Sequence, residues 1–276
     1  MSLDRTTLVA AVRAEREGLG RTIQFAPPGS WEQPSACPGW WNRDVMAHLA
    51  GQDYSVALLV AGEDAPEFDE YRASLDGEPF SMDGFNARLV NVRSGLHYRD
   101  GLTHWGRAAD LLLEEVAALS DADWDARRVD WVAGEIGVPY VLQSRVVEWW
   151  VHGEDIRAGA GMPERVEHWP IHLTSDLAIR MLPWSLDRAG LDLSGLSVQI
   201  DLEGAGQGSW RYGLGANEVP DPDTKPDAWI TGRAKSFALV AAKRIDLDAV
   251  LDVGNLVVGG DEELALTVLR ILRAYP

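Results

Sequence analysis

A glutamate and two histidines have the types and the spacing that a divalent metal ion requires. Glu148 and His152 stand four residues apart in one tract, and His48 lies in an earlier apolar tract. Residues four apart share one face of a helix, so the carboxylate and the imidazole can converge. With a second imidazole from a neighbouring helix, they predict a site of two histidines and one carboxylate. Such a site leaves coordination positions open, which suits catalysis.

The neighbours of this pair carry further chemistry. Arg145 lies three residues before Glu148, and Asp155 lies three residues after His152. We expect Asp155 to orient a ligand histidine as a hydrogen-bond acceptor, and Arg145 either to steady Glu148 or to meet an anionic substrate. The valines and tryptophans around them predict a buried helix, where a carboxylate needs a cationic partner or a metal. By spacing alone, the pair also fits a solvated helix surface, and His48 also fits an ordinary core histidine.

Composition excludes several classes of function. The chain has 276 residues, 46% of them hydrophobic, and a net charge of −18. That charge repels phosphate backbones and anionic lipids, so we expect neither nucleic-acid nor membrane binding. Cys37 is the single cysteine, which rules out an intramolecular disulfide, and we expect it to be structural. The start lacks a signal-peptide core and no apolar run would cross a bilayer, so we expect a soluble cytoplasmic protein of open oligomeric state.

The elements that must position the site are predicted from apolar periodicity. Helices are expected at residues 3–23, 42–61, 81–94, 102–119 and 139–158, with Asn42 as a possible N-cap and Pro139 in a first turn. Residues 62–79 are polar and acidic and predict a surface loop, and residues 121–137 predict a connection. This pattern indicates a four-helix bundle.

A change of pattern at residues 159–163 predicts a boundary between domains at 1–162 and 163–276. The second part predicts a helix at 164–188, a last helix after Asp261 and another helix at 234–243. Strands are expected at 196–202, 209–214, 228–231 and 255–258. The fold class is therefore α+β, with a bundle followed by a smaller mixed domain that has a mainly antiparallel sheet.

Two tracts resemble motifs of the mycothiol-dependent maleylpyruvate isomerase family. The first comprises Cys37-Pro38-Gly39-Trp40, Arg43-Asp44-Val45 and Ala47-His48-Leu49-Ala50, and the second comprises Arg145, Glu148-Trp149-Trp150-Val151-His152-Gly153 and Asp155-Ile156. The resemblance implies a DinB-like four-helix bundle followed by a sterol-carrier-like α/β domain. It also implies that zinc is bound by His48, Glu148 and His152.

The resemblance extends to a cofactor site. The family has an essential arginine after a helix of its second domain, and Arg244 is the matching position. Lys243 stands where glycine is more usual, and Trp41 and the 62–79 insertion also depart from the common pattern. We expect Arg244, with Arg145, to hold carboxylates of the thiol cofactor or the substrate, and we place Trp41 in the cofactor site.

The chemistry follows from the fourth position of such a zinc ion. A thiol bound there loses its proton near neutral pH, and the thiolate can attack an electrophilic carbon. Pro38-Gly39 ties Cys37 to a loop start, so the thiol comes from outside, and the resemblance implies mycothiol. We therefore predict a zinc-dependent S-transferase or cis-trans isomerase that acts on a small-molecule electrophile. Iron and nickel suit the same ligands and stay open.

Two other classes remain. A zinc hydrolase would need a general base near the metal, for which Asp53, Glu154 or Asp155 could serve. A non-catalytic small-ligand-binding protein could enclose an apolar ligand in the tryptophan-rich bundle. A requirement for free mycothiol distinguishes the thiol-dependent enzyme from a hydrolase, which would not need it. Ligand binding that persists after chelation distinguishes a ligand-binding protein from both enzymes. The sequence has no Gly-x-Ser-x-Gly elbow, which argues against an α/β-hydrolase.

Overall fold

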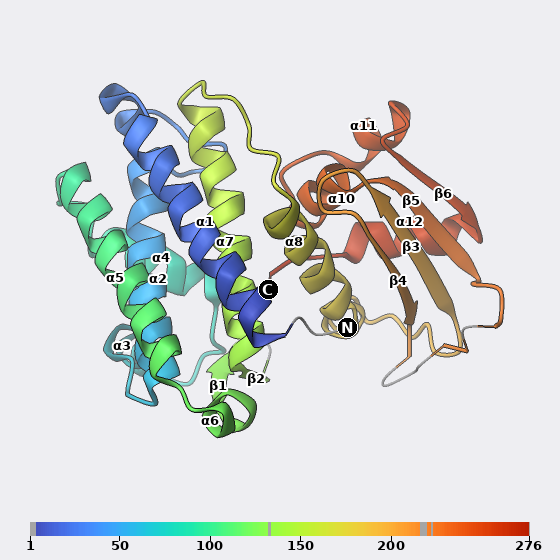
Figure 1. Cartoon of the computed structure of the whole chain (residues 1–276), viewed down its shortest axis with the longest axis horizontal. Helices are drawn as coiled ribbons and strands as arrows, with labels where there is room; N and C mark the ends of the chain where they lie inside the picture. Colours follow the sequence, from blue (N-terminus) through green and yellow to red (C-terminus); the bar gives the residue numbers. More distant parts are fainter. Residues whose placement is uncertain (1–3, 132–133, 216–219, 222, 276) are drawn as a thin grey trace. The chain divides into compact units, whose positions relative to one another are not determined.

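The chain forms two compact units in a computed structural model, which describes residues 4–131, 134–215, 220–221 and 223–275. Met1–Arg165 make up the first unit and Val166–Pro276 the second (Figure 1). Each unit has its own core of buried aliphatic and aromatic side chains. The two units are therefore described separately below.

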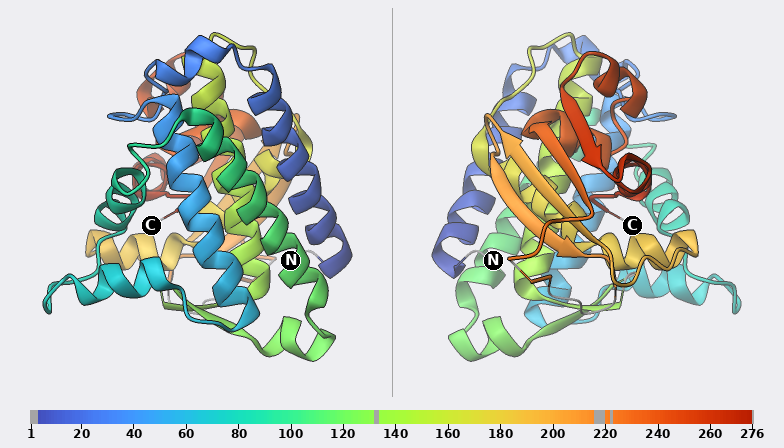
Figure 2. Two further views of the ribbon diagram at one scale, coloured as in Figure 1. Left: turned by 90° about the vertical axis from the view of Figure 1, so that its left-hand side faces the viewer. Right: turned by 90° about the vertical axis from the view of Figure 1, so that its right-hand side faces the viewer.

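The first unit is a four-helix bundle with smaller elements at its edges. Its elements are α1 (Arg5–Phe25), η1 (Pro28–Glu32), α2 (Asn42–Ala61), α3 (Pro66–Ala73), α4 (Met82–Asn91), α5 (Tyr98–Ala118), α6 (Asp121–Ala126), β1 (Arg128–Trp131), β2 (Gly134–Gly137) and α7 (Val138–Gly159). Helix α2 packs against α5 and α7, and α1 packs against the same two helices. Figure 2 shows these four helices side by side.

Helix α7 is buried on almost every face, unlike the one-sided helices of a bundle surface. Val147, Trp149, Trp150 and Val151 have no exposed surface. Its neighbours are α1, α2, α6 and the β1–β2 hairpin, which together cover it. Polar residues on α7 are consequently held in the interior, where an unpaired charge is costly.

The insertion at residues 62–79 was predicted to be a surface loop, and that prediction is wrong. It contains α3, whose Phe68 and Tyr71 pack with Phe85 and Leu89 of α4 in a small separate core. The acidic composition concealed two aromatic residues at helical spacing. Pro66, in the first turn of α3, starts the helix without losing a hydrogen bond.

The ends of several elements also differ from the prediction. Asn42 is the first residue of α2, and Trp41 takes the N-cap position instead. The side-chain amide of Asn42 donates to the carbonyl oxygen of Ser30 at 2.9 Å, so it fastens the preceding loop. The predicted connection at 121–137 contains α6 and the β1–β2 hairpin, apart from residues 132–133, which lie outside the described residues. The predicted start of α1 at Leu3 also lies outside them.

The second unit combines helices with a four-stranded sheet. Its elements are α8 (His168–Arg180), α9 (Leu182–Ala189), β3 (Ser197–Glu203), β4 (Gly208–Gly213), β5 (Ala228–Arg233), α10 (Ala234–Ala241), α11 (Leu247–Asp252), β6 (Leu256–Gly260) and α12 (Glu262–Ile271). The strand order is β4-β3-β5-β6, in which β3 and β5 are parallel and the other two pairs are antiparallel. The predicted α+β class is confirmed.

Alternation on β3 shows which face of this sheet is the core. Val198, Ile200 and Leu202 are buried, and the residues between them are partly or fully exposed. Helices α10 and α12 pack on the sheet, and α8 packs on α10. The helix predicted at 164–188 is broken at Met181, and Pro183 lies in the first turn of α9, where its missing N–H is not needed.

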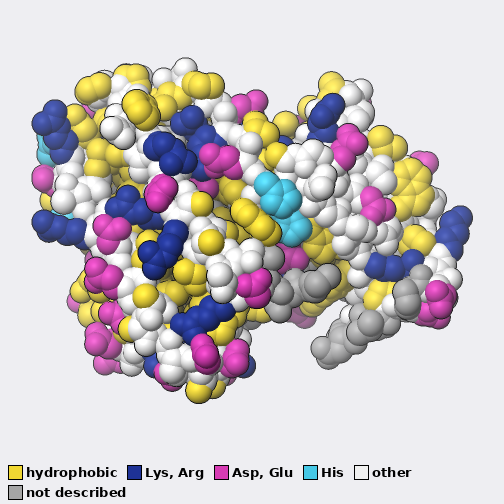
Figure 3. Space-filling view, viewed as in Figure 1, with side chains coloured by type: hydrophobic (Ala, Val, Ile, Leu, Met, Phe, Trp, Pro, Cys, Tyr) yellow, Lys and Arg dark blue, Asp and Glu magenta, His cyan; other side chains and the backbone are white. Residues whose placement is uncertain are grey.

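The surface of the first unit carries charges of both signs. On the face drawn in Figure 3, acidic and basic side chains are interspersed over the bundle. Within the described ranges, no helix has the length and apolar character needed to cross a lipid bilayer.

Candidate metal centre

The structure brings the three predicted metal ligands together inside the first unit. Nε2 of His48 on α2 and Nε2 of His152 on α7 each lie 3.3 Å from Oε2 of Glu148. The donor atoms of the three residues lie within 4.8 Å of one another, and all three residues are buried. Ligands about 2.1 Å from a tetrahedral zinc ion are roughly 3.4 Å apart, so this spacing fits one such ion.

Asp155 completes the α7 side of the cluster. Its Oδ2 lies 2.9 Å from Nδ1 of His152, and Asp155 is almost fully buried. A carboxylate that accepts a hydrogen bond from Nδ1–H fixes the tautomer in which Nε2 has its lone pair free. The geometry is that of a histidine oriented toward a cation by a carboxylate behind it.

Arg145 is fully buried beside Glu148, and its shortest contacts are with Gln52 and Asp53 of α2. Its Nη1 donates to Oε1 of Gln52 at 2.6 Å and to Oδ1 of Asp53 at 3.2 Å. Its Nη2 lies 3.9 Å from Oε1 of Glu148. Glu148 therefore presents one oxygen to the histidines and the other to the guanidinium.

Asp53 is the centre of a second set of contacts. Its Oδ2 accepts hydrogen bonds from Nε1 of Trp149 at 2.6 Å and from Nε1 of Trp105 at 3.0 Å. Burial raises the pKa of Asp53 to about 6, although Arg145 and the Trp149 indole favour its charged form. At neutral pH this carboxylate is therefore mainly ionised in a site without solvent.

The ionisation of Glu148 follows from its neighbours. Burial alone would raise the pKa of Glu148, but hydrogen bonds with His152 and His48, together with the charge of Arg145, hold it well below its usual range. Glu148 is therefore an anion at neutral pH. The buried cluster then contains the carboxylates of Asp53, Glu148 and Asp155 and the single guanidinium of Arg145. With neutral histidines, it has a net charge of about −2, which a divalent cation would neutralise.

Another buried acid in the same bundle shows the contrast. Glu15 on α1 accepts two hydrogen bonds from Arg165, at 2.7 and 2.9 Å. This pair is electrically balanced by itself. The excess of negative charge is thus a property of the set formed by Asp53, Glu148, Asp155 and Arg145 and not of every buried acid in the unit.

The two histidines differ in protonation. Burial lowers the pKa of His48 to about 4, so its ring is neutral at neutral pH and can bind a cation. Burial would also lower the pKa of His152, but Asp155 and Glu148 outweigh it and raise that pKa above its ordinary value. A cation at this site would therefore compete with a proton for His152.

Two tryptophans precede α2, and they lie in different surroundings. The ring of Trp40 lies 5.0 Å from the ring of His48 and 6.1 Å from that of His152. Trp41, predicted to be in the cofactor site, is 42% exposed and has the Arg43 guanidinium 4.6 Å from its ring centre. The sequence indicated Trp40 only through its place in the first family-like motif.

Cys37 also lies close to the cluster, which the sequence did not indicate. Its sulfur is within 4.8 Å of donor atoms of His152 and Asp155. The loop that carries Cys37 is fastened to α7, because the backbone N–H of Ala36 donates to the carbonyl oxygen of Asp155 at 3.1 Å. A contact between a loop and a helix more than a hundred residues away has no signal in local periodicity.

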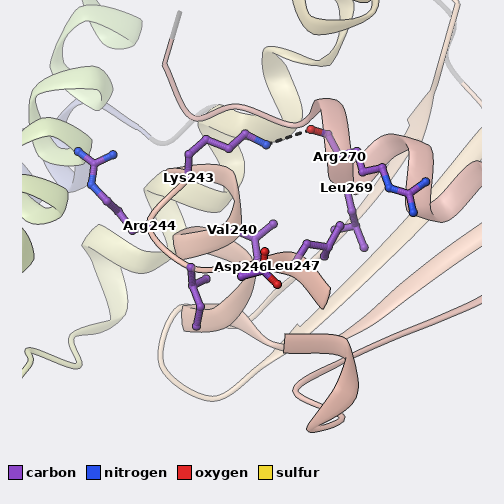
Figure 4. A pocket seen from close by; sticks show the side chains of 8 residues that line it. Val240, Lys243, Arg244, Asp246, Leu247, Leu269 and Arg270 are labelled. Carbon is purple, nitrogen blue, oxygen red and sulfur yellow. Dashed lines mark hydrogen bonds between the residues drawn. The ribbon is translucent and has the colours of Figure 1, made fainter. Parts of the chain in front are cut away.

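Arg244 belongs to the second unit, just after α10. It lines a pocket of about 460 Å³ whose other walls are Val240, Lys243, Ile245, Asp246, Leu247, Leu269 and Arg270. Figure 4 shows Lys243 reaching the carbonyl oxygen of Arg270, at 3.0 Å, while Arg244 points away from both. The pocket combines three cationic side chains and the carboxylate of Asp246 with aliphatic walls. The role of Arg244 toward a thiol stays a prediction.

The fold and the cluster together define a class: a four-helix bundle with two histidines and one glutamate directed to one interior point, followed by a small unit with a mixed sheet. The family model for the mycothiol maleylpyruvate isomerase N-terminal domain matches residues 12–157, which is more than half of the chain. The chain belongs to this family.

Relatives and solved structures extend the likeness to the whole chain. Two uncharacterized proteins of Mycobacterium tuberculosis, from strains CDC 1551 / Oshkosh and ATCC 25618 / H37Rv, are each 24% identical over 273 residues, covering 99% of this chain and 98% of theirs. A crystal structure of the mycothiol-dependent maleylpyruvate isomerase aligns with a TM-score of 0.60 at 16% identity, over 94% of this chain and 92% of that one. A histidine-to-alanine mutant of it gives a TM-score of 0.61 at 16% identity, over 88% and 90%. These structural likenesses establish a common fold.

Proposed function

We propose that the protein is a zinc-dependent enzyme that uses mycothiol as cofactor or substrate, either as an S-transferase or as a cis-trans isomerase. One observation carries the proposal most strongly. The donor atoms of His48, Glu148 and His152 are buried with the spacing of zinc ligands, and with neutral histidines the surrounding Asp53, Glu148, Asp155 and Arg145 sum to about two negative charges. Membership of a mycothiol-related family supplies the class of thiol.

The ligands of the ion would be Nε2 of His48, Nε2 of His152 and Oε2 of Glu148. Zinc held by three protein ligands supplies an open position that lowers the pKa of a bound thiol and favours its thiolate. His48 is suited to this task because it is neutral at neutral pH. Glu148 is suited because it is ionised and directs a single oxygen, Oε2, toward both histidines.

The remaining residues of the centre orient these ligands. Asp155 holds the His152 ring with Nε2 toward Glu148. Trp40 places an aromatic ring against both histidines and limits access of water to them. Both effects keep the nucleophile in a defined direction, which is how a site of this kind lowers the entropic part of a barrier.

Arg244 is proposed to hold a carboxylate of the thiol or of the electrophile. Its neighbours support an anionic ligand, because Lys243 and Arg270 line the same pocket of the second unit. The same proposal keeps Trp41 as a surface for the cofactor, since its exposed indole is available for stacking. Arg145 has no such role here, because its guanidinium is fully buried against Gln52 and Asp53.

A zinc hydrolase is favoured less. Each acid that could serve as its general base already has another partner: Asp53 binds two indoles and Arg145, Asp155 binds His152, and Glu154 accepts from the backbone N–H of Arg165. A general base must reach the proton that it removes, and these carboxylates are directed elsewhere. An external thiol needs no such base when the cation lowers its pKa.

Metal content and thiol-dependent turnover test the proposal together. Purified wild type should contain zinc, and His48→Ala, Glu148→Ala and His152→Ala should lose both the zinc and the mycothiol-dependent reaction. Maleylpyruvate, the substrate in the name of the structural neighbours, is the first electrophile to assay. His104→Ala is the matched control, because His104 is an exposed histidine on α5 of the same bundle.

The proposal fails if the three ligand variants retain zinc and activity at the level of the control. Turnover that depends on zinc but proceeds equally without any thiol would replace the transferase or isomerase with a hydrolase. Ligand binding that survives complete chelation, without turnover, would replace it with a carrier.

A further inference from the structure

We propose that Asp53 is a positioning residue of the metal centre: it holds the guanidinium of Arg145 away from Glu148, so that Glu148 stays available to the cation. The inference rests on the proposed metal centre. It assigns to the Asp53 and Arg145 pair a task that differs from both a general base and a substrate anchor.

The distances show that Arg145 pairs more closely with Asp53 than with Glu148. Nη1 of Arg145 is 3.2 Å from Asp53, whereas its Nη2 is 3.9 Å from Glu148, although both acids are within reach of the same side chain. A guanidinium is planar and usually pairs with a carboxylate through two N–H groups when it can. Such pairing with Glu148 does not occur here.

Arg145 is therefore a potential competitor of the metal ion. Glu148 lies three residues after it on α7, on the same helix face. If the guanidinium turned fully to Glu148, it would neutralise the one carboxylate that a divalent cation needs from this set. The neutral amide of Gln52 also accepts from Arg145, at 2.6 Å, but it has no net charge to oppose the attraction of Glu148.

The surroundings of Asp53 keep it in this position. Indole N–H groups of Trp105 on α5 and Trp149 on α7 both donate to Oδ2, which leaves Oδ1 directed at Arg145. An asparagine at this place has a single carbonyl oxygen for three donors. Whichever way its amide turns, an N–H group faces either the indoles or the guanidinium.

The buried charge predicts the direction in which metal affinity should change. Replacing Asp53 by asparagine lowers the excess of buried negative charge from about two to about one, and it releases Arg145 toward Glu148. Both effects weaken binding of a divalent cation. Removing Arg145 as well restores the excess of about two and removes the competitor. A second mutation in the same core should therefore recover metal affinity, which a purely structural role for Asp53 does not predict.

The experiment measures cobalt affinity of the full chain by competition with a chelating dye, with circular dichroism as a check of folding. Asp53→Asn is expected to bind cobalt about tenfold more weakly than wild type, the lower end of the effect of changing a direct partner of a metal ligand, because Asp53 acts through Arg145. Asp53→Asn with Arg145→Met should return to within about threefold of wild type. Glu15→Gln, which removes an equally buried acid from its arginine, should leave the affinity unchanged.

The outcomes separate this inference from the proposed function. If wild type binds no cobalt, or His48→Ala binds it as tightly, the metal centre itself is wrong. If wild type binds cobalt and Asp53→Asn binds it equally well, the positioning role is wrong. If Asp53→Asn does not fold, the double variant decides. A cobalt affinity near that of wild type supports the role, and a cobalt affinity well below that of wild type overturns it.

Discussion

Asp155 is the residue whose effect on the centre can be isolated most cleanly. It lies 2.9 Å from His152 and is outside the proposed ligand set of His48, Glu148 and His152. Asp155→Asn keeps the size of the side chain but removes the charge that fixes the His152 tautomer. We expect cobalt affinity to fall by roughly 10- to 100-fold, with the stability of the chelated protein much less affected. Equal affinity in a dye competition titration would show that His152 needs no partner.

The unusual pKa of Asp53 predicts a pH dependence of stability. The unfolded carboxyl has a pKa near 3.8, and burial raises it to about 6 in the fold. The folded chain therefore holds a proton that the unfolded chain has lost between these two values. Its unfolding free energy should fall as pH rises through that window and be insensitive to this group outside it.

Urea unfolding of the chelated protein at several pH values measures this effect. The difference in unfolding free energy between wild type and Asp53→Asn should shift by about 2–3 kcal/mol in favour of the variant from pH 4 to pH 6.5. A difference that stays constant over this range would mean that Asp53 is ionised throughout.

At the scale of elements, two glycines of α7 make a matched pair. A Cβ on Gly159 would lie 2.5 Å from the carbonyl oxygen of Pro34 and 3.0 Å from Cα of Ser35. A Cβ on Gly153 would meet only Cδ1 of Leu19, at 3.5 Å, which is an ordinary contact. The end of α7 therefore needs a glycine in order to pack against the loop that carries Cys37 and Trp40.

Gly159→Ala should destabilise the protein by about 1–3 kcal/mol, because backbone atoms must move. Gly153→Ala should be neutral or stabilise it by about 0.5–1 kcal/mol, since alanine has the higher helix propensity. Thermal or urea unfolding of both variants checks the contrast. A loss from Gly153→Ala as large as that from Gly159→Ala would contradict the packing described here.

At the scale of the whole molecule, the centre is confined to one unit. His48, Glu148, His152 and Asp155 all belong to Met1–Arg165, as do their hydrogen-bond partners described above. A chain that ends at Arg165 should therefore fold as a helical bundle and bind cobalt with the affinity of the full protein. Under the proposed function, the mycothiol-dependent reaction should be lost, because the truncation removes Arg244, which is proposed to hold a carboxylate of the thiol or the electrophile.

Circular dichroism and dye competition on the truncated chain make this measurement. Loss of cobalt binding in a folded bundle would show that the second unit contributes to the centre. Full retention of thiol-dependent turnover would show that Arg244 has no part in it.

The local pattern of apolar residues was sufficient to predict much of the fold. The long helices α1 and α5 have apolar residues at a 3.6-residue spacing, so periodicity found them. Helices α2 and α7 are largely apolar on every face and were found as long tracts between Pro and Gly residues. It failed at α3, where Phe68 and Tyr71 form a helix only because Phe85 and Leu89 of α4 offer them a place to pack. Short elements depend on such tertiary contacts more than on their own propensity.

The sequence by itself determined which side chains could be ligands, since Glu148 and His152 can meet on a single helix turn and the family-like motif pairs them with His48. Only the tertiary structure decided what surrounds them. Asp53 accepts hydrogen bonds from two indoles and from Arg145, Trp40 lies against the histidines, and Cys37 lies beside Asp155. The reason is physical. Spacing along a chain fixes which side chains share a helix face, whereas burial, charge balance and contacts between distant segments exist only once the helices pack.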